Sequence, residues 1–118
     1  MPFHYLLTNL LVDVPSAIGA ILVDPEGEAV EWVSRHDDPY QLKIEGAYQG
    51  IFKRQLDDLS NALGRLDAYA IEGERLVSLT HALPQGYYVV LVLDRSGPRA
   101  HAMYHLRRTA RILAREIA

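Results

Sequence analysis

The spacing of hydrophobic residues along the chain predicts three helices. Over residues 3–14 apolar side chains recur three and four positions apart, as in an amphipathic helix, and the position before Pro15 disfavours a helix. A second helix is predicted over residues 39–63, because an aspartate and a proline stand at its start and Gly64 follows its end. A third amphipathic helix is predicted to end at Ile117.

Five shorter segments predict β-strands. A tight turn joins the first two, because Pro25 presets the backbone there and Gly27 supplies a positive φ angle. Residues 17–23 and 87–93 are apolar at nearly every position, so both of their faces should be covered and they should be the central strands. Residues 66–72 are more mixed and suit an edge strand. The five segments are 17–23, 28–33, 66–72, 76–82 and 87–93.

The order of these elements, α-β-β-α-β-β-β-α, predicts an α+β fold. We expect a single domain over residues 1–118 with an antiparallel five-stranded sheet. The second helix should cover one face of this sheet, and the first and last helices should cover the other.

The distribution of charge points to a protein partner. The net charge is −3, but residues 1–94 carry 6 basic and 14 acidic side chains, a balance of −8, whereas residues 95–118 carry 6 arginines and one glutamate, a balance of +5. An acidic body lacks the broad cationic surface that nucleic acids require. The apolar runs are too short to span a bilayer, and the N-terminus has no signal-peptide pattern. Because the chain also has no cysteine, we expect a cytoplasmic protein without disulfides.

Two glycines interrupt the predicted second helix on its outer side. A helical wheel places the apolar side chains, from Tyr40 to Leu63, toward the sheet, and places Gly46 and Gly50 among charged residues on the opposite side. Each glycine costs a helix about 1 kcal/mol relative to alanine. Because glycine lets another backbone approach closely, we interpret the pair as a contact with the same helix of a second copy. The alternative is a surface that tolerates glycine. The charged neighbours are Lys43, Lys53, Arg54 and Asp57.

Three short motifs stand at the boundaries of predicted elements. They are Leu10-Leu11-Val12-Asp13-Val14-Pro15, Gly19-Ala20-Ile21-Leu22-Val23-Asp24-Pro25-Glu26-Gly27 and Gly97-Pro98-Arg99. Together with the element order, they resemble the Roadblock (dynein light chain) family, which shares its architecture with longin domains. The resemblance covers essentially the whole chain, with one departure at Ser16, where relatives often carry glycine.

The resemblance implies a homodimer whose edge strands join into one continuous sheet while the second helices pair. It also implies a non-enzymatic adaptor, and similar bacterial proteins bind Ras-like small GTPases and modulate their nucleotide cycle. The expected dimer interface comprises Lys43, Gly46, Gly50, Lys53, Asp57, Tyr69 and Ile71. The expected partner-binding residues are Lys53, Arg54, Asp57 and Asp58, which could instead be solvated charges. A scaffold for other partners and a small-molecule sensor are the alternative functions.

No group of residues predicts catalysis, a cofactor or a metal site. His101 and His105 have the spacing of metal ligands on a helix, but a third ligand is missing, which favours a structural or solvated role. No serine stands in a nucleophile elbow, and no glycine-rich loop carries a phosphate-binding lysine. A basic face on the last helix has two explanations, cations near a helix C-terminus or a surface for an acidic partner or phosphate. Its arginines are Arg107, Arg108, Arg111 and Arg115.

Overall fold

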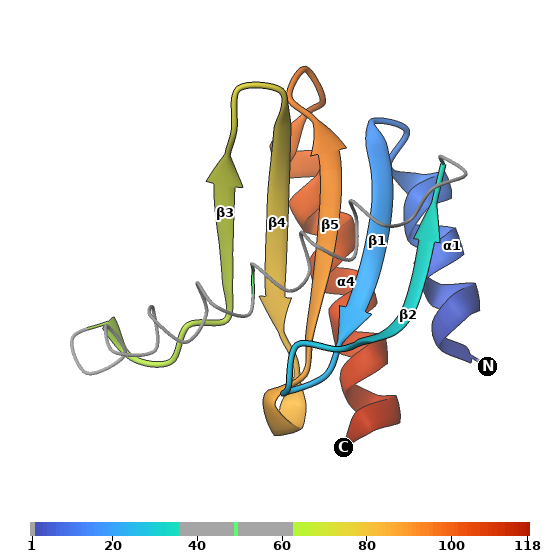
Figure 1. Ribbon diagram of the computed structural model, residues 1–118, viewed down its shortest axis with the longest axis vertical. Coiled ribbons are helices and arrows are strands. Elements are labelled where there is room, and N and C mark those ends of the chain that lie inside the picture. The colour runs from blue at the N-terminus through green and yellow to red at the C-terminus, as the bar shows by residue number, and fades with distance from the viewer. Residues whose placement is uncertain (1, 36–48, 50–62) are drawn as a thin grey trace.

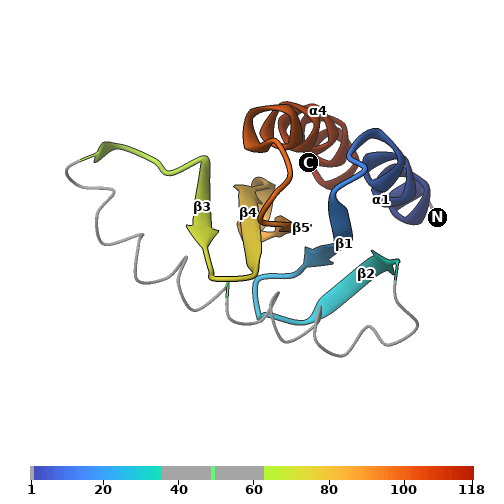
Figure 2. The same ribbon diagram turned by 90° about the horizontal axis from the view of Figure 1, so that it is seen from above.

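Two helices pack side by side against one face of a twisted antiparallel sheet (Figures 1 and 2). The computed structural model describes residues 2–35, Gln49 and residues 63–118. The elements are α1 (Pro2–Asp13), β1 (Ala17–Val23), β2 (Ala29–Ser34), β3 (Ala68–Glu72), β4 (Leu76–Ala82), the 3-10 turn η1 (Pro84–Gly86), β5 (Tyr88–Asp94) and α4 (Arg99–Ile117). Each lies within one or two residues of its predicted position.

The sheet has the strand order β2-β1-β5-β4-β3, and every neighbouring pair is antiparallel. The predicted five-stranded sheet is therefore confirmed. The two strands that are apolar throughout, β1 and β5, lie inside the sheet, and the more mixed strand β3 lies at an edge, as the sequence predicts.

Apolar side chains are buried on both faces of the sheet. Under α1 and α4, alternate residues of the inner strands, such as Leu22 and Leu91, pack with Leu10 and Leu106. The opposite face carries a second cluster, which consists of Ile21, Val23, Tyr88, Val90 and Val92. Because side chains alternate along a strand, two buried faces require the continuous apolar runs of β1 and β5.

The predicted second helix lies almost entirely outside the described residues. Only Gln49 and Leu63 are described, and both are helical. Leu63 is 69% exposed, so the expectation that the apolar side faces the sheet as far as this residue is wrong.

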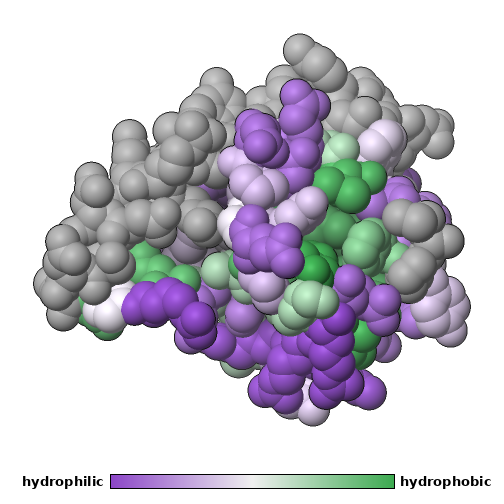
Figure 3. Space-filling view, turned by 90° about the horizontal axis from the view of Figure 1, so that it is seen from below, coloured by the Kyte–Doolittle hydropathy of each residue, from purple (hydrophilic) through white to green (hydrophobic). Residues whose placement is uncertain are grey.

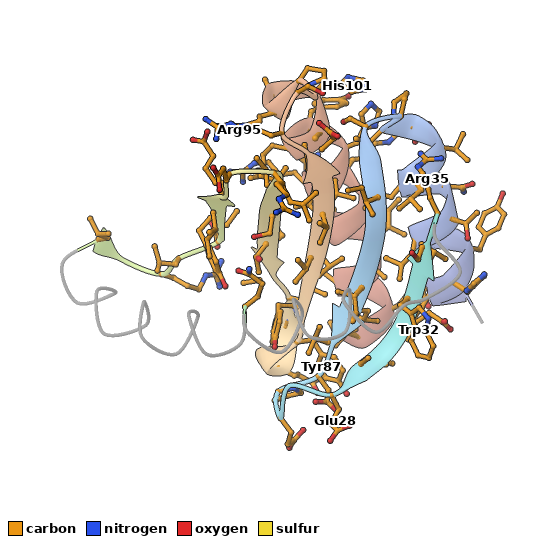
Figure 4. The ribbon with its side chains drawn as sticks, turned by 45° about the horizontal axis from the view of Figure 1, so that its top comes forward. Glu28, Trp32, Arg35, Tyr87, Arg95 and His101 are labelled. Carbon is orange, nitrogen blue, oxygen red and sulfur yellow. The ribbon has the colours of Figure 1, made fainter. Side chains whose placement is uncertain are left out.

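Hydrogen bonds from Arg35 connect the end of α1 to the start of β1. Its guanidinium donates hydrogen bonds to the backbone carbonyls of Leu11, Val14 and Ala17, and it lies beside the end of α1 in Figure 4. The last carbonyls of a helix have no partner within the helix, so a planar cation with several donors is well suited to cap them. Arg35 therefore fixes the point from which the chain leaves β2.

Candidate functional site

The edge formed by β3 differs from the edge formed by β2 at the other side of the sheet. Strand β2 contacts α1, where His4 lies 3.3 Å from Glu31, and its pairing with β1 contains an irregularity between Leu22 and Val23. Strand β3 pairs with β4 in unbroken register, and like β2 it contains one glutamate and neither lysine nor proline. Charges, prolines and bulges are the usual devices that keep an edge strand from pairing further. Of the two edges, β3 is therefore better suited to add another strand.

The side chains of β3 divide between the two faces of the sheet. Tyr69 and Ile71 pair with Thr80 and Ser78, so they lie on the face opposite α1 and α4. Both are half-buried. Ala70 and Glu72 point to the helix-covered face and are exposed, since α4 packs against β4 rather than β3.

A polar contact joins this face of the sheet to Gln49. The Gln49 side chain is 2% exposed, and its Nε2 donates to Ser78 Oγ at 2.9 Å while its Oε1 accepts from Thr80 Oγ1 at 3.3 Å. The Tyr69 hydroxyl donates to the backbone carbonyl of Gln49 at 2.7 Å. Buried polar groups are costly without partners, so this set holds Gln49 at one position over β3 and β4.

An ion pair secures the outer end of β3. The Arg99 guanidinium at the start of α4 contacts the Glu72 carboxylate, and Arg95 donates to the carbonyl of Gly73. The hydrogen bond from Arg99, aided by the positive charges of Arg99 and Arg95, holds the pKa of Glu72 below its ordinary value. The same hydrogen bond raises the pKa of Arg99. Strand β3 is thus attached to α4 at one end and to Gln49 near its middle.

The lowered pKa of Glu72 predicts a pH dependence of stability. Because this pKa is lower in the folded than in the unfolded chain, the carboxylate stabilises the fold above about pH 4.5, and its contribution is lost as the pH falls through the folded pKa. Glu72→Gln should therefore be less stable than the wild type at pH 7, and the difference should close toward pH 3. Urea denaturation across this range measures it, with Glu74→Gln as the control. A difference of the same size at both pH values would contradict the prediction.

A shallow hollow of about 280 Å³ lies at the β3–β4 turn. It is lined by Ile71, residues 73–78 and Val92. Ligand pockets usually span about 300–1,000 Å³ and enclose most of their ligand, so this hollow does not favour the small-molecule sensor.

The two histidines that the sequence singles out as possible metal ligands lie together on α4. His101 and His105 stack edge to face on α4, and both approach Asp13 of α1: His101 Nε2 lies 3.0 Å from its backbone oxygen, and His105 Nδ1 lies 3.8 Å from its carboxylate. Within the described part of the chain, no three potential ligands come together to hold a metal ion. Nor is any helix in that part long and apolar enough to cross a membrane.

Two of the expected interface residues, Tyr69 and Ile71, belong to the described part of the chain. Both lie on the edge strand. Lys43, Gly46, Gly50, Lys53, Arg54, Asp57 and Asp58 lie outside the described residues. The sequence does not predict the polar contacts of Gln49. A signal is present in Ser78 and Thr80, two hydroxyl residues that share one face of a largely apolar strand.

Comparison with solved structures identifies the fold. A structure of MglB with a tetrameric arrangement matches 94% of this chain and 84% of its own, with a TM-score of 0.84 and 23% identity. The gliding protein MglB of Thermus thermophilus matches over 97% and 88%, with a TM-score of 0.85 and 22% identity. A Roadblock/LC7 domain from Streptomyces avermitilis matches over 97% and 96%, with a TM-score of 0.85 and 14% identity.

No protein-family model matches the sequence, and no curated protein matches it either. The structural similarity, which covers nearly the whole chain, shows that the chain has the roadblock-type fold. The resemblance read from the three boundary motifs is confirmed at the level of the fold.

Proposed function

We propose that this protein is a non-catalytic, cytoplasmic homodimer that binds a Ras-like small GTPase across its paired second helices and modulates the nucleotide cycle or location of that GTPase. The observation that carries the proposal is the edge position and the regular pairing of strand β3 in a roadblock-type fold. Self-association also agrees with the tetrameric arrangement of a similar MglB. The GTPase is the partner that the resemblance to the Roadblock family implies.

A twofold axis through the middle of β3 would bring Tyr69 and Ile71, the two expected interface residues of this strand, into contact across the dimer. In an antiparallel pair centred on Ala70, Tyr69 of one copy lies opposite Ile71 of the other, on the face that carries Gln49. An aromatic and a β-branched side chain form a favourable cross-strand pair. Strand β3 would then continue into its symmetry mate and form one sheet of ten strands.

The proposed interface has two parts, the β3 strands and the second helical segments, and the contacts of Gln49 connect them. Gln49 belongs to the second helical segment, while its hydrogen-bond partners belong to β3 and β4. A dimer that joins two β3 strands would therefore also fix the spacing of the two helical segments. A partner that lies across both helices would meet a surface present only in the dimer.

Sedimentation velocity tests the dimer. We expect Ile71→Lys on β3 to shift the protein to the monomer, because two like charges would lie near the twofold axis. Val30→Lys on the edge strand β2 is the matched control and should leave the dimer intact. Gly46→Leu with Gly50→Leu should also favour the monomer, since bulky side chains would separate the helices. A wild-type monomer at every concentration would refute the homodimer.

Calorimetry with a Ras-like GTPase from the same organism, loaded with GDP or with a GTP analogue, tests the partner. We expect the wild type and Val30→Lys to bind and the monomeric variants to bind much more weakly. A dimer that binds the GTPase in neither nucleotide state would overturn this partner and favour the scaffold function, while the proposed dimer would stand.

A further inference from the structure

The outer face of α4 carries a row of arginines that point away from the sheet. The inner face of this helix is buried and consists of Ala102, Leu106, Thr109, Ala110 and Leu113. Helical geometry places Tyr104, Arg108, Arg111 and Arg115 on the opposite side, with Arg107 beside them. Tyr104 is 63% exposed, and hydrophilic side chains gather over α4 in Figure 3. The four arginines Arg107, Arg108, Arg111 and Arg115, together with Tyr104, are called the α4 basic face below.

Unlike Arg65 and Arg99, the arginines of the α4 basic face form no ion pair with the described residues. Arg35 caps α1, Arg65 lies 3.2 Å from Asp67, and Arg99 pairs with Glu72. Among the described residues, no carboxylate lies within 4 Å of Arg107, Arg108, Arg111 or Arg115 in an ion pair. The ion pairs of the described residues therefore do not involve these four guanidinium groups.

A favourable interaction with the helix dipole explains the position of only one of the four arginines. Its effect falls off within the last turn, and Arg115 is the only basic residue in the last turn of α4. Arg111 lies six positions before the end of the helix, and Arg107 and Arg108 lie still further inside. Arginines three or four positions apart on a helix repel one another, so this arrangement weakens the isolated helix. An external anion would relieve that repulsion.

The geometry of the α4 basic face suits an extended chain. Tyr104, Arg107, Arg108 and Arg111 line a shallow groove of about 200 Å³. Arginines at positions 107, 111 and 115 recur about every 6 Å along the helix axis. Alternate side chains of an extended peptide recur about every 6.6 Å, which nearly matches this spacing. A single phosphate could contact only part of the row.

A membrane surface fits this face less well. Helices that lie in the membrane interface insert an apolar side between the lipids. The apolar side of α4 is already buried in the core, where Leu106 and Leu113 are fully covered. The exposed large hydrophobic residue of the α4 basic face is Tyr104 alone, while its charges favour an anionic partner.

From the unpaired arginines, their spacing and the groove, we infer that the α4 basic face binds an extended acidic segment of a partner protein, with carboxylates at every second position. This site lies on the helix-covered side of the sheet, whereas Gln49 lies on the other side. A partner bound at α4 would therefore leave the proposed GTPase-binding surface accessible. The inference does not depend on the identity of the partner on that surface.

Fluorescence anisotropy with a labelled ten-residue peptide, in which glutamate alternates with serine, tests the inference. We expect binding at 50 mM NaCl that weakens at 300 mM NaCl, because salt screens exposed charges. Arg108→Gln with Arg111→Gln should raise the Kd about tenfold, as expected for the loss of several exposed charge pairs. Arg65→Gln with Arg75→Gln changes the net charge equally and should alter the Kd less than about twofold.

Thermal unfolding separates binding from a structural role. If the arginines serve a ligand, Arg108→Gln with Arg111→Gln should unfold at the same temperature as the wild type or slightly higher, because like charges are removed. Equal weakening of peptide binding by the control variant would overturn the inference. So would equally tight binding of inorganic phosphate, or binding to phosphatidylserine vesicles without binding to the peptide.

Discussion

Gln49→Leu is expected to lower the free energy of unfolding by about 2–4 kcal/mol, since it leaves two buried hydroxyl groups without partners. Ser78 is 6% exposed and Thr80 is 1% exposed, so water cannot readily replace the lost amide. The melting temperature should fall by on the order of 10 °C. Differential scanning calorimetry and urea denaturation measure both quantities.

A triple variant separates the loss of hydrogen bonds from a change in packing. Ser78→Ala and Thr80→Val, introduced together with Gln49→Leu, remove both hydroxyl groups that the single change leaves unpaired. Replacing all partners of a buried polar contact by apolar groups is far less costly than removing one of them. We therefore expect the triple variant to recover most of the stability. A triple variant as unstable as Gln49→Leu would show that packing, rather than hydrogen bonding, is the cause.

Gly97→Ala is expected to cost about 1–3 kcal/mol of stability, because it overfills the junction between β5 and α4. A Cβ atom at position 97 would lie 2.2 Å from Ser16 Oγ and 2.4 Å from Ser16 Cβ. Rotation of the hydroxyl could relieve the first contact but not the second, so the backbone of one of the two loops must move. Chemical denaturation should show a lower transition midpoint with an unchanged slope.

Ser16→Gly provides the matched background for this test. Ser16 Oγ is buried and has no hydrogen-bond partner among the residues that the structure describes, and relatives of the resembled family often carry glycine at this position. In a double-mutant cycle, Gly97→Ala should cost much less when residue 16 is glycine, because both atoms that clash are then absent. Equal costs in the two backgrounds would mean that the side chain of Ser16 does not cause the destabilisation.

The sequence predicted most of the fold because its signals there are local. The apolar runs of β1 and β5 identified the central strands, and the mixed composition of residues 66–72 identified an edge strand. The Asp24-Pro25-Glu26-Gly27 turn was also readable: Gly27 has a φ angle of +87°, and the Asp24 carboxylate accepts the backbone N–H groups of Glu26 and Glu28. Each of these features depends on residues close together in the chain.

The candidate site could be predicted only in part. Tyr69 and Ile71 were assigned to the interface through the resemblance, and the structure places them on an edge strand. The hydrophobic periodicity does not predict that Gln49 is buried. A polar residue beside an apolar stripe gives the same sequence pattern whether its side chain is exposed or bonded to a buried partner. Its partners, Ser78 and Thr80, are 29 and 31 positions away.

The sequence by itself determined which segments form helices and strands, which strands are central, and where charge of each sign accumulates. Only the tertiary structure decided that Arg35 caps α1, that Gln49 bonds to β4, and that Arg99 pairs with Glu72 while the arginines of the α4 basic face form no ion pair with the described residues. The reason is physical. Hydrophobic periodicity is set by neighbours a few positions apart, whereas a hydrogen bond or an ion pair depends on which distant segments the fold brings within about 3 Å of each other.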